Sequence, residues 1–122
     1  MVYAMGGVFK SGSPHLDTVE EYDPEHNIWT PKAPMPTARS ELVVVAAPNG
    51  KLYAIGGIAN GNIRAKVEEY DPVTDTWTTM KSMPVARHGL GGAMVNGKVY
   101  AIGGTISNCT SISRVDEYTP PQ

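Results

Sequence analysis

The sequence predicts an all-β fold made of propeller-type blades, and two observations support this prediction. First, landmark residues recur at a fixed spacing, because steps of 48 residues separate Tyr22 from Tyr70, Tyr70 from Tyr118, and Trp29 from Trp77. The same step separates two further pairs, Met35 with Met83 and Arg39 with Arg87. Second, glycines and prolines punctuate short apolar runs, as turns punctuate strands. A repeat period near 50 residues is typical of a propeller blade.

One complete unit shows the landmarks in order, and they carry a resemblance to a known family. The unit reads Gly56-Gly57, then Glu68-Glu69-Tyr70-Asp71-Pro72, then Trp77, then Met83-Pro84-Val85-Ala86-Arg87. This order resembles the kelch repeat, and the resemblance covers essentially the whole chain. It implies four-stranded blades in which the first strand follows the arginine, the second ends at the glycine pair, the third contains Glu-Tyr and the fourth contains tryptophan. The landmarks interpreted as structural are Gly6, Gly7, Tyr22, Trp29, Arg39, Gly56, Gly57, Tyr70, Trp77, Arg87, Gly103, Gly104 and Tyr118.

The first 39 residues predict three strands. Residues 1–7 form an apolar run that can bury both faces, as expected of a strand packed between neighbouring blades. A polar loop follows, and Val19 to Asp23 then forms a strand that Pro24 ends, because proline lacks the donor that a ladder needs. Asn27 to Thr30 is the outer strand, and the prolines that follow it predict an extended crossing to the next blade.

The remaining residues predict seven more strands. Residues 42–47 and 51–55 flank Asn49-Gly50, a dipeptide typical of a two-residue hairpin turn, and Asn96-Gly97 predicts the same turn before residues 98–102. Counted against the blade template, the chain has ten strands, or about two and a half four-stranded antiparallel blades. We expect a partial blade over residues 1–39, a complete blade over residues 40–87 and a partial blade over residues 88–122, all in one arc. Such an arc is shorter than a closed propeller, which has typically 4 to 8 blades.

Composition excludes several classes of function. Ten basic and twelve acidic residues give a net charge of −2, without the basic stripe expected of a nucleic-acid-binding protein. The longest apolar run, Leu42 to Pro48, is too short for a membrane helix, and no signal peptide is readable. Cys109 is alone, which excludes an internal disulfide and favours a reducing compartment such as the cytoplasm without identifying one.

The titratable residues do not form a recognisable catalytic site. The paired acids of each repeat are adjacent on a strand, so their side chains point to opposite faces and cannot act on one bond together. We expect one member of each pair to accept hydrogen bonds from the scaffold and the other to be solvated. His15, His26 and His88 share no metal-ligand spacing. We therefore expect no metal, no cofactor and no catalysis. The alternative is a fragment of a kelch-propeller enzyme, such as a sugar mutarotase or a copper oxidase, whose catalytic residues lie outside this chain.

The resemblance to kelch repeats implies a protein-interaction module whose partner the sequence does not identify. In that family the ligand face is built from the residues after the glycine pair and after the arginine, and these positions vary between the copies here. The corresponding ligand-face candidates are Val8, Phe9, Lys10, Ser40, Glu41, Ile58, Asn60, Arg64, His88, Thr105 and Ser107.

An arc also leaves blade faces open. We expect the side of the first blade with Val2 and Tyr3, and the side of the last blade with Tyr100 and Val115, to be uncovered. Because repeat units cannot bury their apolar faces alone, the sequence predicts self-association through these faces.

Overall fold

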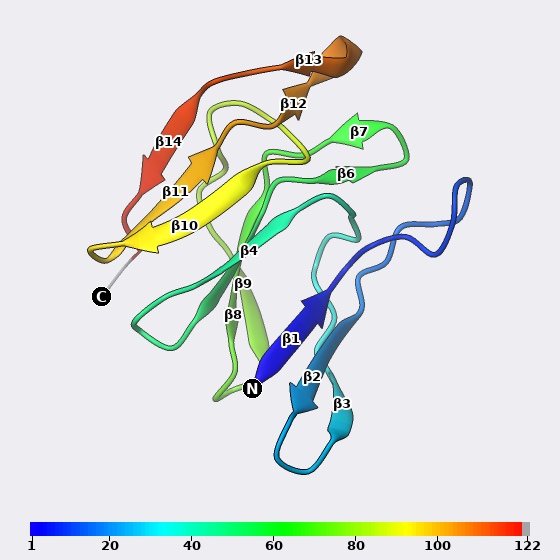
Figure 1. The fold of residues 1–122 in the computed structure, drawn as a ribbon, viewed down its shortest axis with the longest axis vertical. Coiled ribbons are helices and arrows are strands. Elements are labelled where there is room, and N and C mark those ends of the chain that lie inside the picture. Colours follow the sequence, from blue (N-terminus) through cyan, green and yellow to red (C-terminus); the bar gives the residue numbers. More distant parts are fainter. Residues whose placement is uncertain (121–122) are drawn as a thin grey trace.

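Three antiparallel blade sheets follow one another along the chain in the computed structural model, which describes residues 1–120 (Figure 1). The first blade contains β1 (Val2–Met5), β2 (Val19–Asp23) and β3 (Ile28–Lys32). The second contains β4 (Val43–Ala46), β5 (Leu52–Ile55), β8 (Val67–Asp71) and β9 (Thr76–Thr79). The third contains β10 (Gly91–Val95), β11 (Lys98–Ile102) and β14 (Val115–Tyr118). The prediction of an all-β partial propeller is confirmed, with three, four and three strands in successive blades.

Two small hairpins were not predicted. They extend the connections that follow the second strand of the second and third blades. Their strands are β6 (Ile58–Ala59), β7 (Asn62–Ile63), β12 (Thr105–Ile106) and β13 (Thr110–Ser111). A single 3₁₀ turn, η1 (Ser107–Cys109), joins β12 to β13. Within residues 1–120 no helix is long and apolar enough to span a membrane.

The two Asn-Gly turns differ from each other. Asn96 and Gly97 have φ of 50° and 76°, and Val95 pairs with Lys98, so this is the predicted two-residue turn. The prediction for Asn49-Gly50 is wrong, because the amide of Gly50 donates to the Ala47 carbonyl and the Ala47 amide to Lys51, which makes a three-residue loop. Pro48 explains the difference, since its fixed φ suits the first position of a type I turn and it has no amide to pair in the ladder.

The outer strand of the first blade is longer than predicted. β3 continues through Pro31 to Lys32, where the sequence indicated an end at Thr30. Pro31 pairs with Glu20 on one side and lies on the edge of the sheet, so its missing amide breaks no second ladder.

Apolar side chains fill the two seams between the blades. In the seam between the first and second blades, Val19, Met35 and Ala54 are buried, and Trp77 packs against them. The seam between the second and third blades is larger, with the buried side chains Val45, Tyr53, Ile55, Val67, Leu90, Val99 and Ala101. The hydrophobic effect therefore acts mainly between blades, as a propeller requires.

The outer faces of the arc are uncovered within the described residues. The prediction that Tyr3 lies on one of these faces is wrong. Val2 and Val115 are 54% and 57% exposed. Tyr3, which was assigned to the open side with Val2, instead packs edge-on against Tyr70 in the first seam, with ring centroids 5.9 Å apart. Neighbouring residues of a strand point to opposite faces, so Val2 and Tyr3 cannot share one.

Two buried arginines fasten each blade to the next. The backbone of Arg39 bonds to the first blade, since its amide donates to the Leu16 carbonyl and its carbonyl accepts from Gly7. Its guanidinium bonds to the second blade, at the Gly56 carbonyl (2.8 Å) and the Glu68 carboxylate (2.8 Å). Burial lowers the pKa of Arg39 from its ordinary value, and the Glu68 carboxylate opposes that shift.

Arg87 repeats the arrangement one blade later. Its backbone bonds to Arg64 and Gly57 of the second blade, and its guanidinium bonds to Asp116 of the third at 2.6 Å. Both arginines are fully buried. Each arginine therefore connects one blade to the next.

Candidate ligand face

The connections that carry the predicted ligand-face residues leave the blades at the same end. The loop after β1, the β6–β7 hairpin and the β12–β13 hairpin all lie at the upper and right side of Figure 1, whereas the turns that close β2–β3 and β8–β9 lie at the bottom. Because the second strand of every blade runs in the same direction, the residues after each glycine pair gather at one end. We call this end, with its eleven candidate residues, the loop face.

Backbone pairing on the loop face extends the β4–β5 hairpin of the second blade and the β10–β11 hairpin of the third. Ser40 forms an antiparallel bridge with Ile58, through bonds of 2.9 Å and 3.0 Å, and His88 forms the same bridge with Thr105. In each of these two blades the residue directly after the arginine is therefore paired with the residue directly after the glycine pair. Ser40 is buried, so its side chain is the least available of the candidates.

The first glycine of the first two pairs allows the backbone of the next arginine to approach closely. Gly56 has a φ of 69°, and a Cβ there would lie 2.6 Å from the Arg87 carbonyl oxygen. Only glycine suits a position that has a left-handed φ and lies this close to neighbouring backbone, because it has no Cβ.

Most other candidates are available to a partner. Phe9 is 83% exposed, an unusual state for a large apolar side chain. The exposed group is Val8, Phe9, Lys10, Glu41, Asn60 and Ser107, and the half-buried group is Ile58, Arg64, His88 and Thr105. Asn60 holds a φ of 52° at the tip of the β6–β7 hairpin, a conformation that asparagine tolerates better than most residues.

The charges of the loop face are unevenly paired. His88 Nδ1 lies 3.1 Å from Glu41 Oε2. Arg64 is half-buried and has no carboxylate partner within residues 1–120, and its buried Nε has no hydrogen-bond partner there. Arg64 also lies near enough to Arg39 to lower the pKa of that guanidinium. A guanidinium group without a carboxylate partner can donate hydrogen bonds to a carboxylate or carbonyl group of a binding partner.

The acidic pairs lie as the strand geometry requires, on opposite faces. Glu68 accepts from Arg39 in one seam, while Glu69 accepts from the Tyr53 hydroxyl at 2.6 Å and from Lys51 at 3.2 Å in the other. The expectation that one member of each pair is solvated is wrong for this blade, since both glutamates are buried between two neighbouring blades. These carboxylates are occupied by contacts within the fold.

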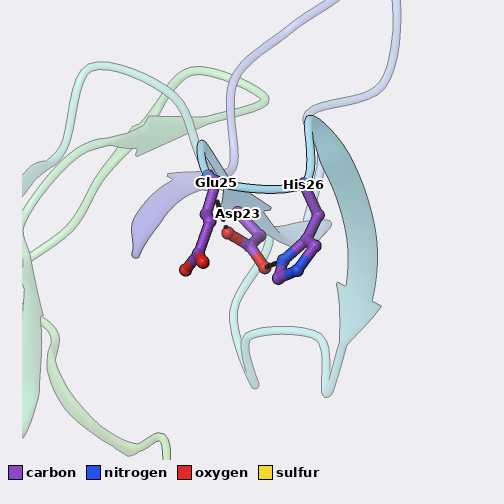
Figure 2. Close-up of side chains that lie close together, drawn as sticks. All are labelled: Asp23, Glu25 and His26. Carbon is purple, nitrogen blue, oxygen red and sulfur yellow. Dashed lines mark hydrogen bonds and ion pairs between the residues drawn. The ribbon is translucent and has the colours of Figure 1, made fainter.

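One titratable cluster was missed by the sequence analysis. Figure 2 shows Asp23, Glu25 and His26 together in the β2–β3 turn, with possible ligand atoms within 4.8 Å of one another. The Asp23 carboxylate is already engaged, because Oδ1 accepts the Glu25 amide at 2.9 Å and Oδ2 lies 2.7 Å from His26 Nδ1. These bonds lower the pKa of Asp23, with the His26 contact as the largest cause. The same aspartate-to-amide bond recurs at Asp71 without a histidine, so the cluster is explained by the turn.

Comparisons with known proteins agree with the repeat. The family model described as "Kelch motif" matches residues 1–36, 42–84 and 86–122. Kelch-like protein 35 of Homo sapiens is 40% identical over 62 residues, which cover 51% of this chain and 10% of that protein. Kelch-like protein 6 of Homo sapiens is 39% identical over 62 residues, with the same coverage of 51% and 10%. Kelch-like protein 35 of Mus musculus is 43% identical over 56 residues, covering 46% of this chain and 9% of that protein. The matched segments therefore span about a tenth of the length of these relatives.

Proposed function

This chain belongs to the kelch-repeat family, and we propose that it acts as a protein-interaction module whose partner binds the loop face. The observation that carries the proposal is the contrast between two sets of positions. The scaffold landmarks repeat from blade to blade, whereas the residues of the loop face differ, with Ser40 replaced by His88 and Glu41 by Gly89 in the next copy. Loops that vary on a constant scaffold are typical of binding surfaces.

The chemistry of the loop face supports a protein partner. Phe9 offers an exposed aromatic anchor, and Arg64 offers five guanidinium donors with no carboxylate opposite them in the described part of the chain. Aromatic residues and arginine are enriched among residues that dominate binding energies. A segment that brings a carboxylate to Arg64 and an apolar side chain to Phe9 would use both.

We also propose that the chain catalyses no reaction. Support comes from the occupation of its buried acids, because Glu68 is bonded to Arg39 and Glu69 to Tyr53 and Lys51. A carboxylate held in this way is a poor general base.

The division into a partial blade (1–39), a complete blade (40–87) and a partial blade (88–122) stays a proposal. Self-association of the chain through its open blade faces also stays a proposal.

The test is a quantitative capture experiment. The immobilised chain is incubated with cell extract, and bound proteins are quantified by mass spectrometry for the parent and for Phe9→Ala/Arg64→Ala. We expect the double variant to lose those partners whose capture by the parent is saturable and is competed by free parent chain. Each side chain removed contributes about 1–2 kcal/mol or more to the binding free energy when it lies at the centre of an interface.

The matched control removes an exposed apolar side chain at the other end of the blades. Val73→Ala changes a residue that is 93% exposed in the β8–β9 turn and should leave capture unchanged. If the control variant loses the same partners, or the double variant keeps all of them, the loop face is not the binding surface.

A further inference from the structure

Besides the Asn-Gly turns of the two blade hairpins, the chain has a third such pair, Asn60-Gly61, at the tip of the β6–β7 hairpin on the loop face. In an Asn-Gly pair the glycine nitrogen can attack the asparagine side-chain carbonyl carbon, because glycine has no side chain that obstructs ring closure. The new carbon–nitrogen bond forms a five-membered succinimide, and the side-chain nitrogen leaves as ammonia together with the amide proton. Water then opens the ring to aspartate or isoaspartate. The net reaction replaces an amide by a carboxylate and consumes only water.

At Asn49 the groups that have to react are held by hydrogen bonds. Its Oδ1 accepts the Lys51 amide at 3.0 Å, and its Nδ2 donates to the Tyr53 hydroxyl at 3.3 Å. The attacking amide, that of Gly50, donates to the Ala47 carbonyl at 3.0 Å. These bonds oppose ring closure at Asn49.

At Asn60 the same groups are free within residues 1–120. Asn60 and Gly61 have φ of 52° and 78°, and both are exposed. Ala59 pairs with Asn62, so this is a two-residue turn, and in the described part of the chain neither the Asn60 side chain nor the Gly61 amide has a hydrogen-bond partner. Figure 1 shows the hairpin projecting away from the blade strands. The turn is therefore open to the water that the second step consumes.

Asn96 lies in the same kind of turn but on a longer ladder. Its turn joins β10 to β11, which pair over five residues each, and β11 also pairs with β14. β6 and β7 pair over two residues each. Ring closure takes the asparagine out of the turn conformation, and such local opening costs least where few pairs hold the backbone. Asn60 therefore combines free reacting groups with the shorter ladder.

We propose that Asn60 is a site of spontaneous deamidation, which gives the loop face a new carboxylate as the protein ages. Where the product is isoaspartate, an additional methylene group enters the backbone of a turn that has positive φ at both central residues. The effect on binding rests on the proposed function. The new carboxylate lies on the hairpin that leads into Arg64, and it repels the partner carboxylate proposed to bind there.

The first test measures deamidation of the full chain without a partner. The folded chain and a sample in concentrated urea are incubated in the same mildly alkaline buffer, and peptide mass spectrometry follows the conversion of amide to carboxylate at each Asn-Gly pair. In urea we expect similar rates at all sites, because each asparagine precedes glycine. In the folded chain, relative to urea, Asn49 should react at least about tenfold more slowly than Asn60, since its hydrogen bonds have to break first. Asn96 should react at a rate between these two.

A matched variant assigns the reaction to its site. Asn60→Gly removes the reacting carbonyl and keeps a turn that glycine accepts at both central positions. It should abolish the conversion at this position and leave the rate at Asn96 unchanged. The proposal is overturned if folding slows the reaction at Asn60 as much as at Asn49, or if Asn96 reacts faster than Asn60.

The second test compares capture of loop-face partners by aged and fresh samples. Aged parent chain should capture them about two- to fivefold more weakly than fresh parent chain, the size of one exposed charge interaction. Asn60→Gly should show no difference between its own aged and fresh samples. Equal effects of ageing in the two chains would contradict the effect of Asn60 on binding. The rates of deamidation are measured without a partner, so their outcome is independent of the proposed function.

Discussion

Two glycines occupy equivalent positions in consecutive repeats but differ in their surroundings. Gly7 and Gly57 have φ of 105° and 107°. A Cβ at Gly57 would lie 2.7 Å from the Ser40 carbonyl oxygen, whereas a Cβ at Gly7 would meet nothing within 4 Å. The two positions therefore separate the cost of a positive φ from the cost of crowding.

We expect Gly57→Ala to destabilise the fold more than Gly7→Ala. Both variants strain the backbone by about 1–2 kcal/mol, and only the first also presses a methyl group into the backbone of the neighbouring segment. Gly57→Val should cost several kcal/mol, because a β-branched residue fits neither condition. Chemical denaturation measures the differences. Equal losses for the two alanine variants would show that crowding contributes nothing.

Tyr53 gives the fold a dependence on alkaline pH. Burial raises the pKa of its hydroxyl to about 12, and the hydrogen bond to Glu69 acts in the same direction. The neutral phenol is favoured in the folded state, so its stabilisation is complete below the ordinary value near 10 and is lost as pH rises from 10 towards 12. The free energy of unfolding should fall by roughly 1–2 kcal/mol from this residue over that interval. Denaturation of the parent and of Tyr53→Phe at pH 8 and pH 11.5 measures it, and an equal fall in both would assign the loss to other groups.

At the scale of elements, the repeat spacing was enough to predict the blade strands but not everything between them. Each blade strand contains a recurring landmark or lies next to one, so its place could be counted along the chain. The hairpins β6–β7 and β12–β13 have strands of two residues, too short for alternation to show in the sequence. The loop at Pro48 was misjudged because Asn-Gly was interpreted without the residue before it.

The candidate site divides in the same way. The positions of the loop face could be predicted, because variation against a constant scaffold is visible in one sequence. The engaged state of Asp23 and the lack of a carboxylate partner for Arg64 within residues 1–120 could not be predicted, because each depends on residues that folding brings together. Tyr3 was assigned to the wrong face because its apolar run hides the alternation of the strand.

The two tryptophans of the outer strands allow a test of how much packing in a seam contributes to the free energy of unfolding. Trp77 lies in a seam and donates to the Ala33 carbonyl, while Trp29, at the equivalent position of the first blade, is 52% exposed. We expect Trp77→Ala to cost about 2–4 kcal/mol and Trp29→Ala less than about 1 kcal/mol, as measured by thermal or chemical denaturation. A similar cost at both sites would indicate that the indole stabilises its own blade and not the seam.

The whole molecule presents two faces that its own described blades do not cover. Val2 and Trp29 lie on one, Ile102 and Val115 on the other, and each face matches residues that are buried in an internal seam. The open face of the third blade can therefore receive the open face of the first blade of another copy, a head-to-tail contact.

We expect concentration-dependent self-association, measured by multi-angle light scattering over a hundredfold range of concentration. Val2→Glu/Val115→Glu should shift the chain towards monomer, because burying a carboxylate in an apolar contact is unfavourable. Val73→Glu adds a charge at an equally exposed site away from both faces and should have no effect. A folded monomer at every concentration of the parent would contradict the expectation.

The two arginines that connect the blades have a consequence for cooperativity. Arg39 cannot keep its guanidinium satisfied once the second blade opens, and the Arg87 backbone loses its anchors in the same event. When the second blade unfolds, the first and third blades should therefore lose their contacts with it at the same time. We expect no stable intermediate in which the second blade alone is unfolded. Native-state hydrogen exchange should show the amides of Gly7 and Gly57, which donate to the two arginine carbonyls, exchanging with one shared free energy of opening. In Arg39→Met, which leaves Glu68 uncompensated, that shared opening should split into separate steps for the first blade and for the rest.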